Sequence, residues 1–301
     1  MASIPSYISL FENGELTQRI QFLNESLKEC RLCPRECRVN RLDGEVGVCQ
    51  AGSDLTISSA FPHFGEEPPL VGNHGSGTIF LTHCNLRCIF CQNYDISHLG
   101  RGERITSSDM THIMLRLQEV GCHNINFVTP THYAPQIMAS LPEAIEKGLR
   151  LPIVYNCSGY ESIEVIRLLE GIVDIYMPDA KYMDEKYSKR FSNASDYPTV
   201  IKEVLKEMYR QVGDLTVNAK GVAERGLLIR HLVMPGGIAS SEAMLKFIAE
   251  EISIHSYVNI MEQYRPEYRA HEYPEISRRV TLKEYTEAIQ WAKHYRLYRG
   301  F

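Results

Sequence analysis

The chain has 301 residues, of which 44% are hydrophobic, and a formal net charge of −5. This length fits one large α/β barrel or two smaller domains, and the apolar content is sufficient for a folded core. The lack of a basic excess argues against a nucleic-acid partner held through its phosphates. No apolar stretch approaches the roughly twenty residues that a membrane span requires, and the first residues lack the pattern of a secretory signal. We therefore expect a cytoplasmic protein that binds no membrane, and its charge disfavours a nucleic-acid partner.

The sequence contains nine cysteines, and seven of them lie in two tight groups. Thiols stay reduced in the cytoplasm, so this grouping indicates metal binding rather than disulfide bonds. The other two cysteines, Cys122 and Cys157, stand alone in the sequence. Lone thiols are most often small buried residues, and we expect that here.

Residues 1–76 are predicted to form a cysteine-rich N-terminal segment and a linker. Its first part should contain a short helix, because Leu16, Ile20, Leu23 and Leu27 recur at helical spacing. The first thiol group follows as Cys30, Cys33 and Cys37, with a fourth thiol, Cys49, after a glycine-rich turn that lets the chain reverse.

Four thiols make a complete ligand set for one metal ion or one closed cluster. A single Cys-x2-Cys-x3-Cys run with a remote fourth cysteine favours an auxiliary iron–sulfur cluster, because zinc sites usually show two Cys-x2-Cys pairs. Structural zinc, and thiols that bind nothing stably, remain alternatives. Four arginines interleave this group and are expected to form a solvated basic face: Arg31, Arg35, Arg38 and Arg41.

The segment 52–77 is predicted to be a short hairpin or linker, because it alternates weakly and then becomes rich in turn residues. Glu66 and Glu67 lie in its turn-rich part. They could line the mouth of a site, but exposed loop carboxylates are the interpretation that we adopt.

Residues 77–301 show a strand–helix rhythm and are predicted to form the main domain, with a C-terminal helix. The helices include one that Ser107 or Ser108 should cap and a last one that opens with the capping box Thr281-x-x-Glu284. Alternating strands and helices imply parallel pairing through right-handed crossovers, and six units make a barrel-like sheet short of the usual eight. The strand candidates are Thr78–Thr82, Asn124–Thr129, Pro152–Asn156, Ile172–Met177, Gly226–Val233 and Tyr257–Met261.

The second thiol group, Cys84, Cys88 and Cys91, directly follows the first of these strands. Soft thiolates select zinc or an iron–sulfur cluster. A closed zinc site needs four ligands, and only His83 is nearby as a fourth. A cubane cluster works with three thiolates, because its fourth iron can take an external ligand. We therefore expect a [4Fe-4S] cluster, with a zinc knuckle as the alternative.

The other strand ends provide a test, because ligand sites in parallel α/β folds form at the carboxyl ends of the strands. Each apolar run is followed by residues that are polar or rich in glycine and proline, as this hypothesis requires. These ends are Thr129–His132, Asn156–Gly159, Met177–Lys181, Met234–Gly237 and Glu262–Arg265.

The Cys-x3-Cys-x2-Cys spacing resembles the signature of the radical S-adenosylmethionine (radical SAM) superfamily, in which the open iron binds the amino and carboxylate groups of that cofactor. The core from about residue 77 to 265 looks like the activating enzymes of glycyl-radical enzymes, typified by the pyruvate formate-lyase activating enzyme. The whole chain resembles a branch of that group with the same upstream Cys-x-Leu-Cys-Pro-Arg-x-Cys segment. The resemblance implies a partial (β/α)6 TIM-like barrel.

The resemblance also implies roles for single residues. Cys84, Cys88 and Cys91 would hold the cluster. The contacts with S-adenosylmethionine would come from Phe90 near the adenine, from Thr129 and Thr131 where the family has Gly-Gly-Glu, from Asp179 and Lys181 near the carboxylate, and from Arg230 and Leu232 at the ribose and adenine. Asn156 is a further cofactor-binding candidate at the third strand end. A surface pair of Asp179 with Lys181, a structural ion pair of Arg230, and a helix cap by His132 are the alternatives.

The implied activity is reductive cleavage of S-adenosylmethionine to a 5′-deoxyadenosyl radical that abstracts a hydrogen atom. The expected partners are an electron donor such as flavodoxin or ferredoxin and, as for glycyl-radical activases, a protein substrate. A small-molecule or an RNA substrate is the alternative, and the acidic balance disfavours RNA. The rival hypothesis is a non-catalytic zinc or iron–sulfur module that acts as an electron carrier or scaffold.

Overall fold

The computed structural model describes residues 4–301 and contains six parallel strands in one sheet. They pair in the order β2 (Ser76–Leu81), β4 (Ile125–Val128), β5 (Ile153–Cys157), β6 (Ile175–Pro178), β8 (Ala223–Leu232) and β9 (Tyr257–Met261). Within residues 4–301, no pairing joins β9 back to β2, so the barrel is open there. The predicted partial (β/α)6 barrel is confirmed, and each predicted strand overlaps an observed one.

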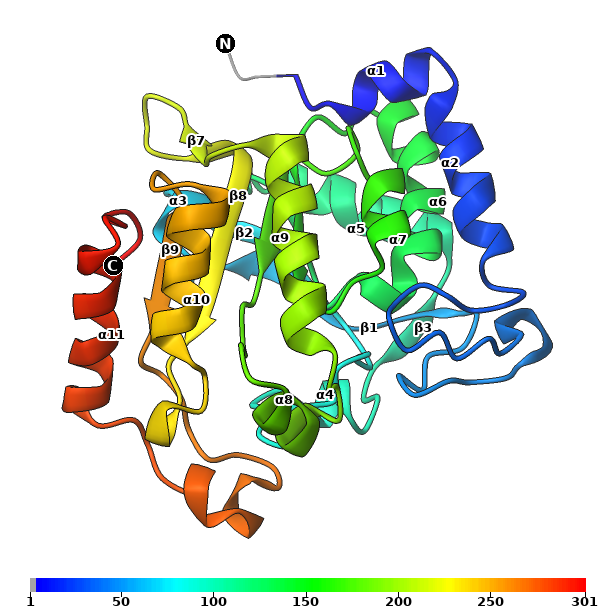
Figure 1. Ribbon diagram of the computed structural model, residues 1–301. Coiled ribbons are helices and arrows are strands. Elements are labelled where there is room, and N and C mark those ends of the chain that lie inside the picture. The colour runs from blue at the N-terminus through cyan, green and yellow to red at the C-terminus, as the bar shows by residue number, and fades with distance from the viewer. Residues whose placement is uncertain (1–3) are drawn as a thin grey trace.

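Helices cover the outer face of this sheet, and the strands lie behind them in Figure 1. Six helices follow strands in chain order and connect them: α5 (Ser107–Glu119), α6 (Ala134–Glu146), α7 (Ile163–Leu168), α8 (Glu185–Ser192), α9 (Tyr197–Val212) and α10 (Ser241–Phe247). The remaining helices are α1 (Tyr7–Glu12), α2 (Glu15–Glu25), α3 (Pro68–Val71), α4 (Tyr94–Ser97) and the C-terminal α11 (Leu282–His294). No helix in the described part of the chain combines the length and apolarity needed to cross a membrane.

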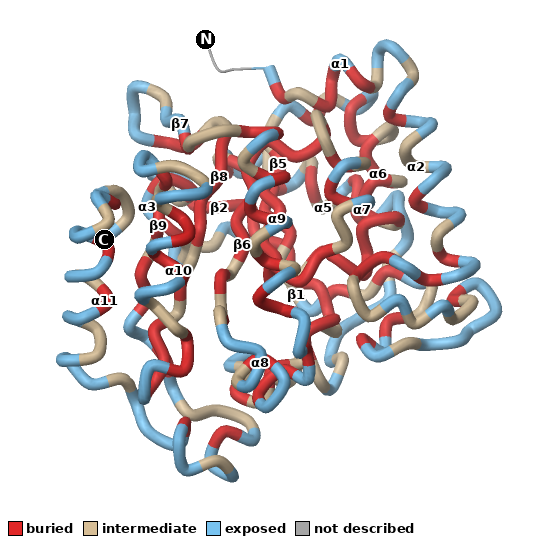
Figure 2. Tube along the Cα trace, viewed as in Figure 1, coloured by how far each residue is buried: buried red, intermediate tan, exposed pale blue. Residues whose placement is uncertain are grey.

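The strands form the buried centre, which Figure 2 shows in red between the partly exposed helices. Every residue of β5 is buried, as expected for a parallel strand that is covered on both faces. The helices add one apolar face each. In α9, for example, Ile201, Val204, Leu205 and Met208 recur at helical spacing and are all fully buried.

The segment that we interpreted as a short hairpin or linker contributes an antiparallel strand to the sheet. Strand β1 (Leu55–His63) pairs antiparallel with β2, and β3 (Glu103–Ile105) pairs antiparallel with β1. A further short strand, β7 (Thr216–Val217), pairs antiparallel with β8. The sheet therefore continues across residue 76, while the division into segments 1–76 and 77–301 stays a prediction.

Helix α3 closes the inside of the barrel below the strand ends. Its Leu70 packs in a small apolar cluster with Val154 of β5, Met177 of β6 and Leu228 of β8. Because side chains alternate along a strand, these positions share a face with Asn156, two residues further along β5. The segment before α3 is thus held beneath the carboxyl edge of the barrel.

Two helix caps show how local sequence fixes the helix starts. Thr106, rather than Ser107 or Ser108, caps α5, because its Oγ1 accepts a hydrogen bond of 3.1 Å from the Asp109 amide. The predicted capping box at Thr281 and Glu284 is confirmed at the start of α11.

Gly159, just after β5, provides a test of packing at the strand ends. Its φ is +74°, and an added Cβ would lie 2.4 Å from Ile201 Cδ1 and 2.9 Å from the Asp179 carbonyl oxygen. Gly148 also has positive φ, but a Cβ there would meet nothing within 4 Å. We expect Gly148→Ala to lower the free energy of unfolding by about 1 kcal/mol through backbone strain. Gly159→Ala should cost a further ~1–3 kcal/mol through overpacking. Equal losses in denaturant titrations of the two variants would contradict this packing.

Candidate functional site

A cavity of about 270 Å³ lies at the carboxyl ends of the six parallel strands. It is lined by residues that follow or end each of these strands, as the strand-end test predicted. The predicted site residues around it are Cys84, Cys88, Phe90, Cys91, Thr129, Asn156, Asp179, Lys181, Arg230 and Leu232. Gln263 and Tyr264 close it beyond β9. Of the predicted residues of this site, only Thr131 does not line the cavity.

The three thiols of the loop after β2 each have a donor or hydroxyl group nearby. Ser192, the last residue of α8, donates its hydroxyl to Cys88 Sγ at 3.1 Å. Cys91 Sγ lies 3.1 Å from Ser97 Oγ, and Cys84 Sγ accepts the amide of Leu86 at 3.4 Å. Hydrogen bonds of this kind orient ligands and tune the potential of an iron–sulfur cluster.

Burial dominates the acid–base state of these thiols. It raises the pKa of Cys84 and Cys91, and it raises that of Cys88 to about 12. Thiols of this kind become ligands only by releasing their protons to a metal. Within residues 4–301, no three His, Cys, Asp or Glu side chains converge as ligands of one ion would. A cubane cluster has a different requirement, because its three thiolates bind three separate irons, and three thiols spread around one cavity fit that group.

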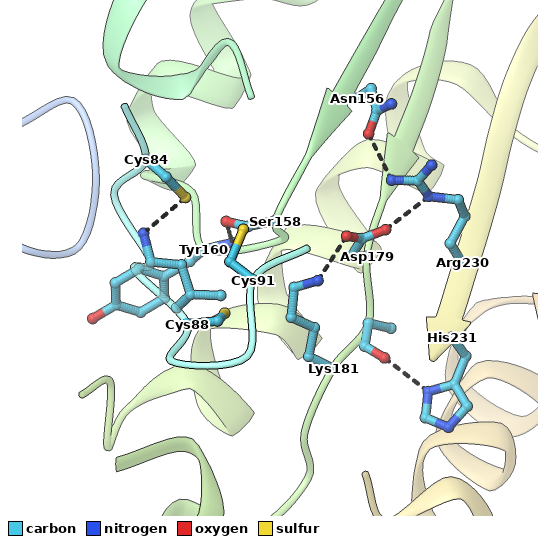
Figure 3. A network of polar contacts seen from close by, with 12 residues as sticks. Cys84, Cys88, Cys91, Asn156, Ser158, Tyr160, Asp179, Lys181, Arg230 and His231 are labelled. Atoms are coloured by element: carbon cyan, nitrogen blue, oxygen red, sulfur yellow. Dashed lines mark hydrogen bonds and ion pairs between the residues drawn. The ribbon is translucent and has the colours of Figure 1, made fainter. Parts of the chain in front are cut away.

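A largely buried charge network joins the ends of three strands across the cavity from the thiols (Figure 3). Asp179 accepts hydrogen bonds of 2.7 Å from both Arg230 Nε and Lys181 Nζ, and Arg230 Nη2 donates to Asn156 Oδ1 at 2.8 Å. Burial raises the pKa of Asp179, but the charges of Arg230 and Lys181 outweigh it and hold that pKa below its usual value. The surface-pair interpretation of Asp179 and Lys181 is therefore wrong.

Glu66 and Glu67 complete this network from below, and their interpretation as exposed carboxylates is wrong. Their side chains are only 7% and 5% exposed, and they lie 3.5 and 3.8 Å from Arg230 Nη1. Asn259 of β9 donates to Glu67 at 2.9 Å. Burial raises the pKa of Glu66 to about 7. All three nitrogens of the Arg230 guanidinium thus face acceptors within the protein, which supports its structural ion-pair alternative.

The end of β4 is turned by an unusual backbone conformation. Thr129 has φ of +61°, which β-branched residues rarely adopt, and its amide donates to the Asn156 carbonyl at 2.8 Å. A positive φ is the conformation that glycine adopts most readily. Thr131 points elsewhere and donates its hydroxyl to buried Glu161 at 2.9 Å. His132 caps no helix, since its Nε2 lies 2.8 Å from the Thr82 carbonyl oxygen.

The first thiol group is largely buried. Cys30, Cys33 and Cys49 are 8–9% exposed, whereas Cys37 is half-buried. Burial raises the pKa of Cys33, and the neighbouring thiols Cys49 and Cys30 raise it further. An added Cβ on Gly47 would lie 2.7 Å from Cys37 Sγ, so this glycine allows the return turn to approach the first three cysteines.

The arginines around this group do not form one solvated face. Arg31 and Arg38 are exposed as predicted, but Arg41 is fully buried and donates to the carbonyl oxygens of Gly52 and His132. Arg35 is half-buried and donates to backbone carbonyls in two other parts of the chain. The prediction is therefore wrong for Arg35 and Arg41.

Sequence reasoning also missed Arg87, which lies between Cys84 and Cys88 and lines the cavity. Its Nη1 is buried without a hydrogen-bond partner, and the structure shows no ion pair for it within residues 4–301. The other two cations of the cavity, Lys181 and Arg230, are both paired with Asp179. The charge of Arg87 is therefore available to an anionic group bound beside the thiols.

Buried Glu161 should make the stability of the protein depend on pH. Burial raises its pKa from 4.5 to about 7, although the hydroxyls of Thr131 and Tyr155 partly offset this. A carboxyl with a raised pKa contributes stability that is complete below the unfolded-state pKa and is lost as the pH rises through the folded-state value. The contribution should thus disappear between about pH 4.5 and 7.

We expect to observe this loss when the free energies of unfolding of the parent protein and of Glu161→Gln are measured between about pH 4.5 and 7. The free energy of unfolding of the parent protein relative to the variant should fall by about 3 kcal/mol as the pH rises. Glu119→Gln, at an exposed helix position, is the control and should run parallel to the parent protein. A constant difference between the parent protein and Glu161→Gln would contradict the assignment.

Comparisons with known proteins agree with this geometry. The sequence pattern of the Radical SAM superfamily matches residues 78–224, which include the Cys84–Cys91 loop and the strand ends up to β6. Uncharacterized protein MJ0674 of Methanocaldococcus jannaschii is 33% identical over 291 residues, which cover 94% of this chain and 79% of that protein. Superfamily membership implies an enzyme with a [4Fe-4S] cluster and S-adenosylmethionine, and the donors around the cavity fit both groups. The chain belongs to the radical SAM superfamily.

Proposed function

We propose that the protein binds a [4Fe-4S] cluster through Cys84, Cys88 and Cys91 and cleaves S-adenosylmethionine reductively. When bound, the two groups together supply a 5′-deoxyadenosyl radical that abstracts a hydrogen atom from the substrate. The observation that carries this proposal is the single cavity shared by the three thiols and the polar residues of the other strand ends. A non-catalytic electron carrier would not need these converging side chains.

The residues of this cavity have distinct tasks in the proposal. Lys181 lies between the thiol loop and Asp179 (Figure 3), so its ammonium group can meet the cofactor's carboxylate without leaving its ion pair. Phe90 is buried, and its ring centroid lies 6.5 Å from that of Tyr182 and 5.8 Å from that of Tyr264. It presents an apolar wall for the adenine. Leu232 adds apolar surface from the end of β8. Together these side chains exclude water from a reactive intermediate.

The substrate in this proposal is a partner protein in which a glycine loses a hydrogen atom. The support is the resemblance of the core to glycyl-radical activases, together with a barrel that is open between β9 and β2. The electron would come from a small donor protein such as flavodoxin or ferredoxin. The acidic net charge of −5 makes an RNA substrate a poorer fit.

Cys30, Cys33, Cys37 and Cys49 form a second metal site in this proposal. Four thiols, three of them buried, suit a closed iron–sulfur cluster, in which each thiolate binds a separate iron. One zinc ion is the poorer fit, because among residues 4–301 no three such side chains converge as the ligands of a single ion would. Iron–sulfur is our assignment, on the spacing of the cysteines.

Cys88→Ala tests the first cluster. We expect anaerobically reconstituted protein with dithionite and S-adenosylmethionine to release 5′-deoxyadenosine, and the variant to release at least 100-fold less, because a thiolate ligand is lost. Cys122→Ala removes a buried thiol outside both groups and should keep the parent activity. Liquid chromatography of the quenched reaction measures the product. Full turnover by Cys88→Ala, or zinc without iron in reconstituted parent protein, would refute the proposal.

Cys30→Ala tests the second site. The variant should contain less metal per chain than the parent protein while still showing the spectroscopic signal of the first cluster. Elemental analysis for iron and zinc identifies which metal is lost. An unchanged metal content would show that these thiols hold nothing.

A further inference from the structure

Arg35 connects the two thiol groups. It lies two residues after Cys33 and two before Cys37, within the first group. Its side chain leaves that segment and packs over the ring of Tyr160, with 5.1 Å between Cζ and the ring centroid. Tyr160 belongs to the loop after β5, which also borders the cavity through Ser158. The guanidinium therefore lies between the N-terminal segment and the barrel.

All three nitrogens of the Arg35 guanidinium donate to backbone carbonyls of two other segments. Nε donates to Asn85 at 3.1 Å, and Nη2 donates to Leu86 at 3.3 Å and to Ser192 at 3.0 Å. Nη1 donates to Asn193. A planar fork with five N–H donors can serve four carbonyls at once, and lysine cannot reproduce this geometry.

The carbonyls that Arg35 binds belong to the segments that surround Cys88. Asn85 and Leu86 lie in the loop between Cys84 and Cys88, and Ser192 donates its hydroxyl to Cys88 Sγ at 3.1 Å. Leu86 in turn donates its amide to Cys84 Sγ. Arg35 thus fixes both the backbone between two thiols and the group that donates to one of them.

The hydrogen bonds of Arg35 also satisfy carbonyl groups at the C-terminal end of α8. Helix α8 ends at Ser192 and Asn193 caps it with φ of +48°, so the last carbonyls of the helix lack partners within it. A positive charge at a helix C-terminus is stabilising, because the helix dipole is negative there. Arg35 supplies that charge and satisfies two of these carbonyls.

We propose that metal bound at Cys30, Cys33, Cys37 and Cys49 holds the first cluster in place through Arg35. The metal fixes the turn that carries Arg35, and Arg35 transmits this order to the Cys84–Cys88 loop and to Ser192. Arg35 is a positioning residue, since it touches no reacting atom. This inference rests on the proposed function, in which the second site holds an iron–sulfur cluster, and adds that the second site supports the first mechanically.

The test compares Arg35→Met with Arg31→Met in reconstituted full-length protein. Arg31 is an exposed arginine in the same segment, and within residues 4–301 it is paired only with Glu29, so it is a matched control. We expect Arg35→Met to keep its N-terminal metal but to lose iron from the first cluster to a chelator at least five-fold faster than the control. Its reduced cluster should also show an altered electron paramagnetic resonance spectrum, because the surroundings of Cys88 change.

Double variants test whether the two sites are coupled through this side chain. Cys30→Ser with Cys33→Ser should accelerate iron loss to the same extent, and adding Arg35→Met should accelerate it no further. Additive effects would show that the sites are independent and would overturn the inference. A parent-like chelation rate and spectrum for Arg35→Met would also overturn it.

If Arg35→Met does not fold, Arg35→Lys decides, because it keeps the charge but loses the fork. An iron-loss rate above that of the Arg31→Met control supports the inference, and a rate equal to the control overturns it. Failure of the proposed function looks different, because the parent protein would then hold no iron at Cys84, Cys88 and Cys91 at all.

Discussion

The ion pair between Arg230 and Asp179 is the interaction on which the site most depends. The regular pairing of β6 with β8 is short, with Ile175 opposite Gly226 and Tyr176 opposite Leu227. Beyond it, the strands are rejoined by an isolated bridge between Asp179 and Arg230, and the same two side chains form the ion pair. The ion pair between Asp179 and Arg230 therefore joins β6 and β8 beside the cavity, where the regular backbone pairing of the two strands has ended.

This network is costly to disrupt, because its charged side chains are at most 18% exposed. Removing one partner of a buried ion pair typically costs about 3–5 kcal/mol, since the other charge is left unpaired. Here the positive charge of Arg230 is shared by three carboxylates, because Arg230 pairs with Asp179 and also lies close to Glu66 and Glu67. The segment before α3 is thus tied to the floor of the site by charge as well as by the packing of Leu70.

The N-terminal segment contributes to the site in a comparable way. Arg41 is buried against the backbone of His132, after β4, and half-buried Arg35 donates to the thiol loop and to the end of α8. Both arginines belong to the cysteine-rich part of the chain, in which three of the four thiols are buried. The segment is therefore more than an appended module, because Arg35 and Arg41 both donate hydrogen bonds to backbone carbonyls of the barrel.

The sequence was sufficient for what depends on local pattern. Strand and helix periods predicted the six parallel strands, and the spacing of Cys84, Cys88 and Cys91 predicted a ligand loop at the end of the first. Antiparallel β1 was missed because its alternation is weak and its end is rich in turn residues. Contacts between distant residues were also out of reach. Asn259 and Glu67 are 192 residues apart, and Arg35 and Ser192 are 157 apart.

The buried charges illustrate why this limit is physical. Glu66 and Glu67 precede two prolines, a context that is typical of an exposed turn. Only the fold reveals that Arg230 lies beside these two carboxylates inside the barrel. A carboxylate in a protein interior needs such a partner to stay charged. Thr129 is a similar case, because its positive φ is imposed by the strand end and not by its own preference.

The most direct measurement for the central claim is the electron paramagnetic resonance spectrum of the reduced protein with and without S-adenosylmethionine. A cluster held by Cys84, Cys88 and Cys91 keeps one iron free of protein thiolate, so the cofactor should bind that iron and shift the g values. The signal and its shift should both be absent in Cys88→Ala. A [4Fe-4S] signal that S-adenosylmethionine leaves unchanged, or a reduced parent protein without any such signal, would contradict the account.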